Sequence, residues 1–126
     1  MKKLLLFILV ALCGAGSFNA AAQAEKPKTT KYEIRHQGME RSYWLYIPEN
    51  LRDDAPLVVV LHGYGGKAEG YRPEMVETAR KHGFAVCYPQ GAKDKKEKNC
   101  WNVGYPFQAG LKTDDVDFIC DLARHL

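Results

Sequence analysis

Serine is scarce in this chain, and the short sequence spacings typical of zinc ligands are absent from it. The only serines among the 126 residues are Ser17 and Ser42. Ser42 stands in an alternating, strand-like stretch without neighbouring glycines, so it does not resemble a nucleophile on a glycine-flanked turn. No Cys-x-x-Cys or His-x-x-x-His spacing occurs, and a zinc site therefore has little support. We expect no metal site.

Long apolar runs are also missing. The longest one at the amino terminus covers residues 4–12, follows Lys2 and Lys3, and leads to Ala22-Gln23-Ala24. These are the three parts of a secretory signal peptide, and we predict cleavage after Ala24. A bilayer span needs about 20 apolar residues, so no stable membrane anchor is expected. The predicted location is secreted or periplasmic.

Net charge is small. The formal charge of +3 falls to +1 when the two lysines of the leader are removed. A nearly neutral chain is not attracted over long range to nucleic acid or anionic membranes, so neither is an expected partner. The basic residues of 93–98 are interspersed with acids and are interpreted as a solvated loop.

Three cysteines remain after cleavage: Cys87, Cys100 and Cys120. Exported proteins meet oxidising conditions, so we expect a disulfide between Cys87 and Cys100, which bracket one loop. Cys120 is left over and is interpreted as a buried helix residue, or as one whose partner lies outside this sequence.

The stretch 57–66, Leu-Val-Val-Val-Leu-His-Gly-Tyr-Gly-Gly, organises the rest of the chain. Five apolar residues predict a strand buried on both faces of a parallel sheet. The glycines that follow predict a sharp loop at the carboxyl end of that strand, where α/β sheets bind ligands. The loop lacks the spacings of phosphate-binding and dinucleotide-binding motifs, so no cofactor is expected. The simplest alternative is a glycine-rich turn without function.

The other elements predict an α/β fold. Residues 25–30 are interpreted as a flexible lead-in to a domain over residues 31–126. Alternation around Gln37-Gly38, with Tyr43, Leu45 and Ile47 set against the residues between them, predicts a hairpin at the edge of a sheet. A helix over 74–82 with Gly83 as its cap, then a strand over 84–88, complete a parallel crossover unit. Residues 93–110 form a long, mostly structureless loop rich in aromatics.

The last helix is expected after Thr113, which would cap it. Asp114 and Asp115 are catalytic residue types, but their position favours a role in the first helical turn, against the helix dipole. We expect His62, directly after the buried strand, to shape its loop by hydrogen bonding. His36, His82 and His125 occupy positions where solvated histidines are ordinary.

Taken together, five segments resemble secreted α/β-hydrolase esterases of the polyhydroxybutyrate depolymerase and feruloyl esterase family. They are residues 41–48, 56–63, 83–91, 100–102 and 114–119, in the family's order. The resemblance covers the amino-terminal part of such a fold and stops before the Gly-x-Ser-x-Gly nucleophile elbow. We therefore expect an incomplete chain that is inactive alone, because the triad would lie beyond Leu126.

The resemblance also implies roles for named residues. The loop 62–66 matches the oxyanion loop, with the backbone N–H of Tyr64, next to Gly63, as a candidate donor. Trp101, Asn102 and Tyr105 would line the substrate cleft, although Trp101 could equally cover the sheet edge. The implied substrate is a carboxylic ester on a plant polysaccharide, such as a feruloyl or acetyl group, or a polyester.

Two alternatives stay open at this point. One is a secreted, non-catalytic binding module derived from an esterase. The other is a hydrolase of the prolyl oligopeptidase type, which shares the His-Gly loop but fits residues 89–91 and 100–101 less well.

Overall fold

The computed structural model describes residues 28–70 and 73–126. The predicted signal peptide and most of the lead-in lie outside these residues. In chain order the elements are β1 (Thr30–His36), β2 (Met39–Tyr46), β3 (Leu57–Val59), η1 (Ala68–Gly70), α1 (Pro73–His82), β4 (Ala85–Pro89), β5 (Ala92–Lys93), β6 (Asn99–Cys100), η2 (Pro106–Gln108) and α2 (Asp115–His125).

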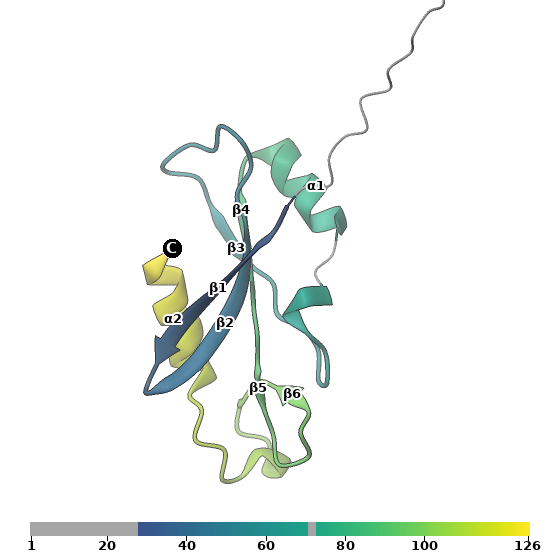
Figure 1. Cartoon of the computed structure of the whole chain (residues 1–126), viewed down its shortest axis with the longest axis vertical. Helices are drawn as coiled ribbons and strands as arrows, with labels where there is room; N and C mark the ends of the chain where they lie inside the picture. The colour runs from purple at the N-terminus through teal and green to yellow at the C-terminus, as the bar shows by residue number, and fades with distance from the viewer. Residues whose placement is uncertain (1–27, 71–72) are drawn as a thin grey trace, which may run out of the picture.

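Four strands form a mixed sheet in the order β1-β2-β4-β3 (Figure 1). β1 pairs with β2 and β2 with β4 in antiparallel fashion, whereas β3 and β4 are parallel. The predicted crossover from β3 through α1 to β4 is therefore confirmed. Helices on a partly parallel sheet fit a portion of an α/β-hydrolase fold.

The predicted hairpin is confirmed as β1 and β2, with His36 paired to Met39 across a two-residue turn. Gln37 and Gly38 both have positive φ, 48° and 79°, the conformation that tight hairpin turns demand. The predicted alternation ends one residue early, because Ile47 lies beyond the end of β2 and is 57% exposed. β2 is an inner strand, so residues on both of its faces are largely buried.

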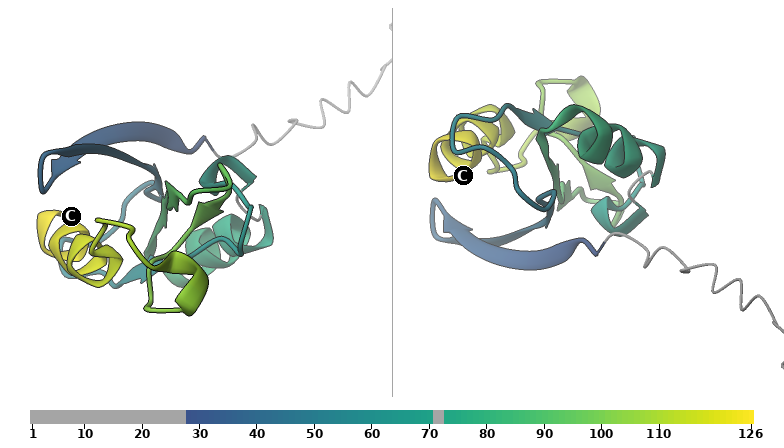
Figure 2. Two further views of the ribbon diagram at one scale, coloured as in Figure 1. Left: turned by 90° about the horizontal axis from the view of Figure 1, so that it is seen from below. Right: turned by 90° about the horizontal axis from the view of Figure 1, so that it is seen from above.

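The two helices cover opposite faces of the sheet (Figure 2). On the α1 side the core contains Tyr46, Ala68, Val76, Ala79, Val86 and Tyr88. On the α2 side it contains Tyr43, Leu45, Cys87, Phe118 and Leu122. Successive β4 residues alternate between the two cores, as strand geometry requires. β4 is therefore the central strand.

The prediction of a five-residue strand buried on both faces is wrong in its extent. The ladder with β4 covers Leu57–Val59, with one further bond from the Val60 amide to Cys87 O at 2.8 Å. These strand residues are half-buried, and Leu61 is 49% exposed. The reason is position: β3 ends the strand order, and within the described residues its outer edge has no partner. The parallel direction was predicted correctly, whereas the central position belongs to β4.

The helix ends follow local capping chemistry. α1 begins one residue before the predicted start, and Gly83 closes it with φ 71° and an N–H···O bond of 2.8 Å to Ala79. The predicted cap at Thr113 is wrong by one residue. Asp114 caps α2, because its carboxylate accepts the Asp117 amide at 2.9 Å.

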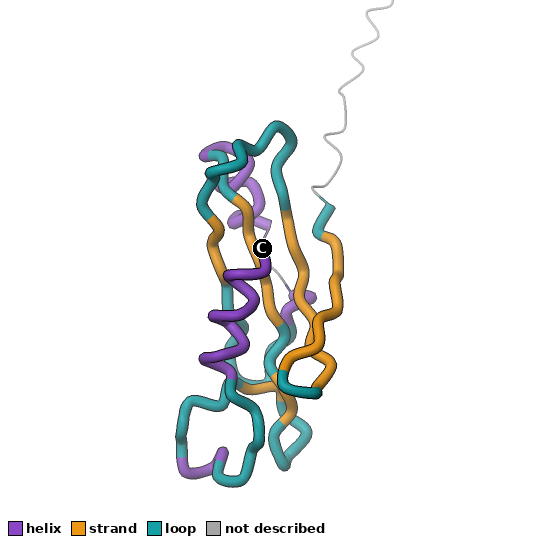
Figure 3. Tube along the Cα trace, turned by 90° about the vertical axis from the view of Figure 1, so that its left-hand side faces the viewer, coloured by secondary structure: helices purple, strands orange, loops and turns teal. Residues whose placement is uncertain are grey.

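Residues 92–111 are more ordered than predicted. β5 and β6 form a small second sheet, and η2 follows them. Seen from the side, these segments gather at the end of the molecule where α2 starts (Figure 3). The turn between β5 and β6 is not simply solvated, since Asp94 is 6% exposed and accepts the amides of Lys96 and Lys98.

None of the helices in the described ranges combines the length and the apolar character that crossing a bilayer would require.

Candidate active site

The loop 62–66 lies just beyond the carboxyl end of β3, at the edge of the parallel β3–β4 pair where such sheets bind ligands. Its second half is pinned to β6. The amide of Gly65 donates to Asn99 O at 2.7 Å, and the Asn99 side chain donates to Gly66 O at 2.7 Å. Gly65 has φ 75°, which suits glycine. The loop is thus held by contacts at its far end.

Two adjacent, exposed amides of this loop have no acceptor within the described residues. Within the described residues the N–H groups of Gly63 and Tyr64 donate no hydrogen bond, whereas those of Gly65 and Gly66 do. Both residues are exposed. Adjacent, unpaired amides on a pinned loop can receive a developing negative charge. The assignment of Gly63 and Tyr64 to an oxyanion hole stays a prediction.

The His62 ring fastens the start of the loop. Its Nε2 accepts the Gly91 amide at 2.9 Å, so the proton is on Nδ1, which donates to Gly63 O at 2.8 Å. The Gln90 amide nitrogen is also 3.0 Å from Nε2. Because Nε2 already accepts a hydrogen bond and Nδ1 donates one, neither nitrogen of the His62 ring is free to act as a base. The interpretation that His62 shapes the loop is confirmed.

Glycine is required at position 91. A Cβ there would lie 2.5 Å from Cys100 O and 3.0 Å from His62 Nε2. Gly91 is therefore the point at which the end of β4, the β5–β6 sheet and the His62 ring meet. This contact sets the distance between the loop and β6.

Trp101 packs against His62 at the start of the same loop. Its indole N–H donates to His62 O at 2.8 Å, and its ring centroid is 5.0 Å from that of His62. The ring also packs against the core cluster beneath α2. Since the indole N–H is already used, the contacts favour a positioning role over substrate hydrogen bonding.

Asn102 faces α2. Its side chain donates to Thr113 O at 2.7 Å, and its backbone amide donates to Asp115 Oδ2 at 2.6 Å. These bonds fix the chain between β6 and α2. The predicted role of Asn102 in substrate binding has no support from these contacts and stays a prediction.

Tyr105 belongs to an exposed aromatic patch, which we define as Tyr64, Tyr105 and Phe107. Tyr105 stacks on Phe107 at 5.6 Å, and Tyr64 meets Phe107 edge-on at 5.7 Å. Each of the three is more than half exposed. The residue with the candidate oxyanion amide thus also contributes its ring to an apolar surface.

The Tyr64 hydroxyl orients that residue by donating to Asp94 Oδ2 at 2.6 Å. The bond raises the pKa of Tyr64. The same bond, followed by the backbone donation from Lys98, lowers the pKa of Asp94. The carboxylate form of Asp94 therefore holds both the β5–β6 turn and the Tyr64 side chain.

Sequence reasoning missed the buried pair Arg41–Asp115. Nη2 of Arg41 lies 2.7 Å from Asp115 Oδ1 and also donates to Gln90 O at 3.2 Å. Asp115 lies in the first turn of α2, as predicted, and its carboxylate is buried against Arg41. A signal was available, because Arg41 lies on the same strand face as Tyr43 and Leu45, where a charge needs a partner.

The predicted bridge between Cys87 and Cys100 is not formed in the structure, where both are free, buried thiols. Cys87 packs in the core under α2, while Cys100 belongs to the second sheet. The expectation that Cys120 is buried is wrong, since its side chain is exposed on α2.

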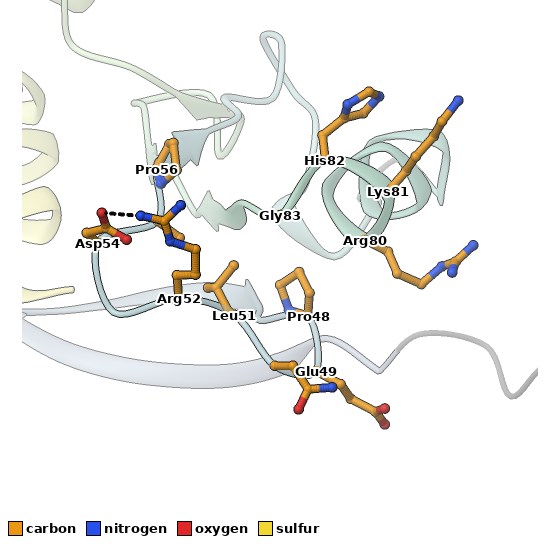
Figure 4. Close-up of a pocket in the computed structure, with 12 residues that line it drawn as sticks. Pro48, Glu49, Leu51, Arg52, Asp54, Pro56, Arg80, Lys81, His82 and Gly83 are labelled. Carbon is orange, nitrogen blue, oxygen red and sulfur yellow. Dashed lines mark hydrogen bonds and ion pairs between the residues drawn. The ribbon is translucent and has the colours of Figure 1, made fainter.

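A pocket lies at the opposite end of the main sheet, between the loop that follows β2 and the end of α1 (Figure 4). Its lining includes Pro48, Arg52, Pro56, His82 and Gly83, and no residue of the loop 62–66. It is therefore separate from the candidate site.

Comparison with known proteins supports an esterase. Residues 41–111 match the family described as esterase PHB depolymerase, and this match covers more than half of the chain. The chain belongs to this family. The match spans β2, the loop 62–66 and the aromatic patch, and family membership does not favour the peptidase alternative.

Curated relatives carry a related activity in their names. The chain is 36% identical over 62 residues to a probable acetylxylan esterase A of Aspergillus clavatus, covering 48% of this chain and 19% of the relative. Acetylxylan esterase A of Aspergillus oryzae is 32% identical, with the same two coverages. The aligned segment thus spans about a fifth of the length of these relatives. Among solved structures, a bacterial heroin esterase aligns with TM-score 0.48 and 27% identity, covering 55% of this chain and 23% of that one.

Proposed function

We propose that this chain is the part of an exported serine-type carboxylic ester hydrolase that carries the oxyanion loop. The observation that carries the proposal is the pair of unpaired amides at Gly63 and Tyr64, on a loop pinned at both ends beside β3. Family membership supports ester hydrolysis as the chemistry.

Acyl transfer through serine also needs a nucleophile, a base and an orienting acid. His62 is engaged, Asp115 is buried against Arg41, and Ser42 lies in the middle of β2. Residues 28–70 and 73–126 therefore offer a candidate group for charge stabilisation but no assembled triad. We expect no turnover from it alone.

Acetyl groups on xylan are the proposed ester, because the curated relatives that align are acetylxylan esterases by name. A polyester or a feruloyl polysaccharide would suit the same loop. Export through the predicted signal peptide, cleaved after Ala24, would bring the protein to such polymers.

The proposal is tested in two steps. The 126-residue chain is assayed with p-nitrophenyl acetate and with acetylated xylan, and no release above the blank is expected. The coding sequence downstream of Leu126 is then read for a Gly-x-Ser-x-Gly turn. A stop codon at that point, or turnover by the short chain, would contradict the proposal.

If that turn is present, Tyr64→Pro in the longer enzyme removes the candidate donor. Loss of one oxyanion donor costs about 100- to 1,000-fold in kcat. Tyr64→Phe keeps the amide and is the matched control. Equal kcat values for both variants would rule out the Tyr64 amide.

A further inference from the structure

His36 is buried between two carboxylates at the end of β1, contrary to the solvated position expected for it. Its side chain is 5% exposed, with Nδ1 3.2 Å from Asp121 Oδ2 and Nε2 3.5 Å from Asp117 Oδ2. Phe118 lies against the imidazole at 5.5 Å between centroids. The cluster is distant in sequence from the loop 62–66 and joins the hairpin to α2.

The cluster places two carboxylates around one imidazole. In its neutral form the imidazole carries one N–H, so it can donate to only one carboxylate while the other faces a nitrogen lone pair. Within the described residues the buried Nε2 makes no hydrogen bond. Asp117 and Asp121 are also four residues apart on α2, where like charges repel. A cation between these groups would remove both costs.

We propose that His36, Asp117 and Asp121 bind a divalent cation of the zinc class. One ligand atom from each side chain lies within 4.8 Å of the other two. One imidazole nitrogen with two carboxylate oxygens is a donor set for borderline ions such as Zn²⁺ rather than for Mg²⁺. The proposal is independent of the esterase function.

Neighbouring groups hold the carboxylates in place. The Gln37 amide donates to Asp117 Oδ2 at 2.9 Å, and Arg124 pairs with the other oxygen of Asp121. Such outer contacts orient metal ligands. Arg124 contributes one positive charge against the two negative charges of the aspartates, so with the neutral form of His36 the cluster keeps a negative balance that favours a cation.

The site is tested by equilibrium dialysis of the purified chain against ZnCl₂ with excess MgCl₂, followed by metal analysis. About one zinc per chain is expected, with the bound fraction lost in Asp117→Asn and in Asp121→Asn. Both substitutions keep side-chain shape, and far-UV circular dichroism checks that the variants fold. His125→Gln and Cys120→Ser, which alter exposed residues of the same helix, are matched controls and should retain the zinc.

A second readout does not depend on stoichiometry. Zinc should raise the temperature of thermal unfolding of the parent chain and of both controls, but not that of the two aspartate variants. Zinc binding that survives in the aspartate variants, or is lost in the controls, would overturn the proposal. Absence of zinc binding by the parent chain would overturn it as well.

Discussion

Arg41 is the residue on which the packing of the site region depends. Its guanidinium is 3% exposed, pairs with Asp115, and lies 3.8 Å above the Phe118 ring. Asp115 in turn accepts the Asn102 amide. A single buried ion pair therefore connects β2, α2 and the chain that leads from β6.

Asp115→Asn is expected to destabilise the fold strongly. It leaves the Arg41 charge buried without its counter-ion, and breaking such a pair costs about 3–5 kcal/mol. Urea unfolding followed by tryptophan fluorescence measures the change. Asp54→Asn is the control, because the Arg52–Asp54 pair has the same 2.7 Å distance but is 81% and 71% exposed. We expect that control to cost less than about 1 kcal/mol; equal losses would contradict the buried-pair argument.

Individual residues divide clearly into those that the sequence could predict and those that it could not. His62 follows a strand directly, so its use in the adjoining loop could be predicted from neighbouring residues. Arg41 and Asp115 are 74 positions apart in the sequence. His36, at the end of β1, contacts Asp121 on α2. These contacts depend on how α2 is placed on the sheet, which local patterns do not encode.

At the scale of elements, β4 determines the order of the sheet. It pairs with both β2 and β3 and supplies alternate residues to the two cores. Cys87 lies in its middle, fully buried. Burial raises the pKa of the Cys87 thiol to about 12, because the thiolate cannot be solvated there.

The raised pKa predicts a loss of stability in alkaline solution. The ordinary value is 9.0, so between pH 9 and about pH 12 the unfolded chain releases a proton that the folded chain retains. The Cys87 contribution is therefore unchanged below pH 9, and stability falls as pH rises through this window. Cys87→Ala should flatten this part of a pH series of urea midpoints. A slope equal to that of the parent chain would contradict the assignment.

The pattern of elements was predictable where periodicity and caps were strong. The hairpin, the β3–α1–β4 crossover and the Gly83 cap all follow from short-range signals. The β5–β6 sheet was not predicted, because its strands are two residues each and are held by Asp94 and by the Gly65–Asn99 bond. An apolar run indicates burial but not strand order. The sequence therefore pointed to β3 as the central strand, whereas β4 is the central strand in the structure.

For the whole molecule, the notable feature is where apolar surface is left exposed. In the part of the chain that the structure describes, the large exposed apolar residues are Tyr32, Ile47, Leu61, Tyr64, Val103, Tyr105, Phe107, Val116 and Leu126. Most are scattered, which is ordinary for a protein surface. The aromatic patch differs, because Phe107 contacts both other rings and the patch lies next to two unpaired amides. A contiguous patch of this kind marks a binding surface more often than chance exposure does.

The aromatic patch is therefore expected to dominate binding of a planar apolar dye such as 8-anilinonaphthalene-1-sulfonate. Phe107 touches both other rings, so Phe107→Ser should divide the patch and lower the dye fluorescence of the folded chain. Val116→Ser removes a side chain that is more exposed, 65% against 54%, but has no ring contact. We expect this control to leave the signal nearly unchanged. Similar losses in the two variants would mean that the dye reports scattered apolar area or a loosened core, and the aromatic patch would then have no special standing beside the candidate oxyanion loop.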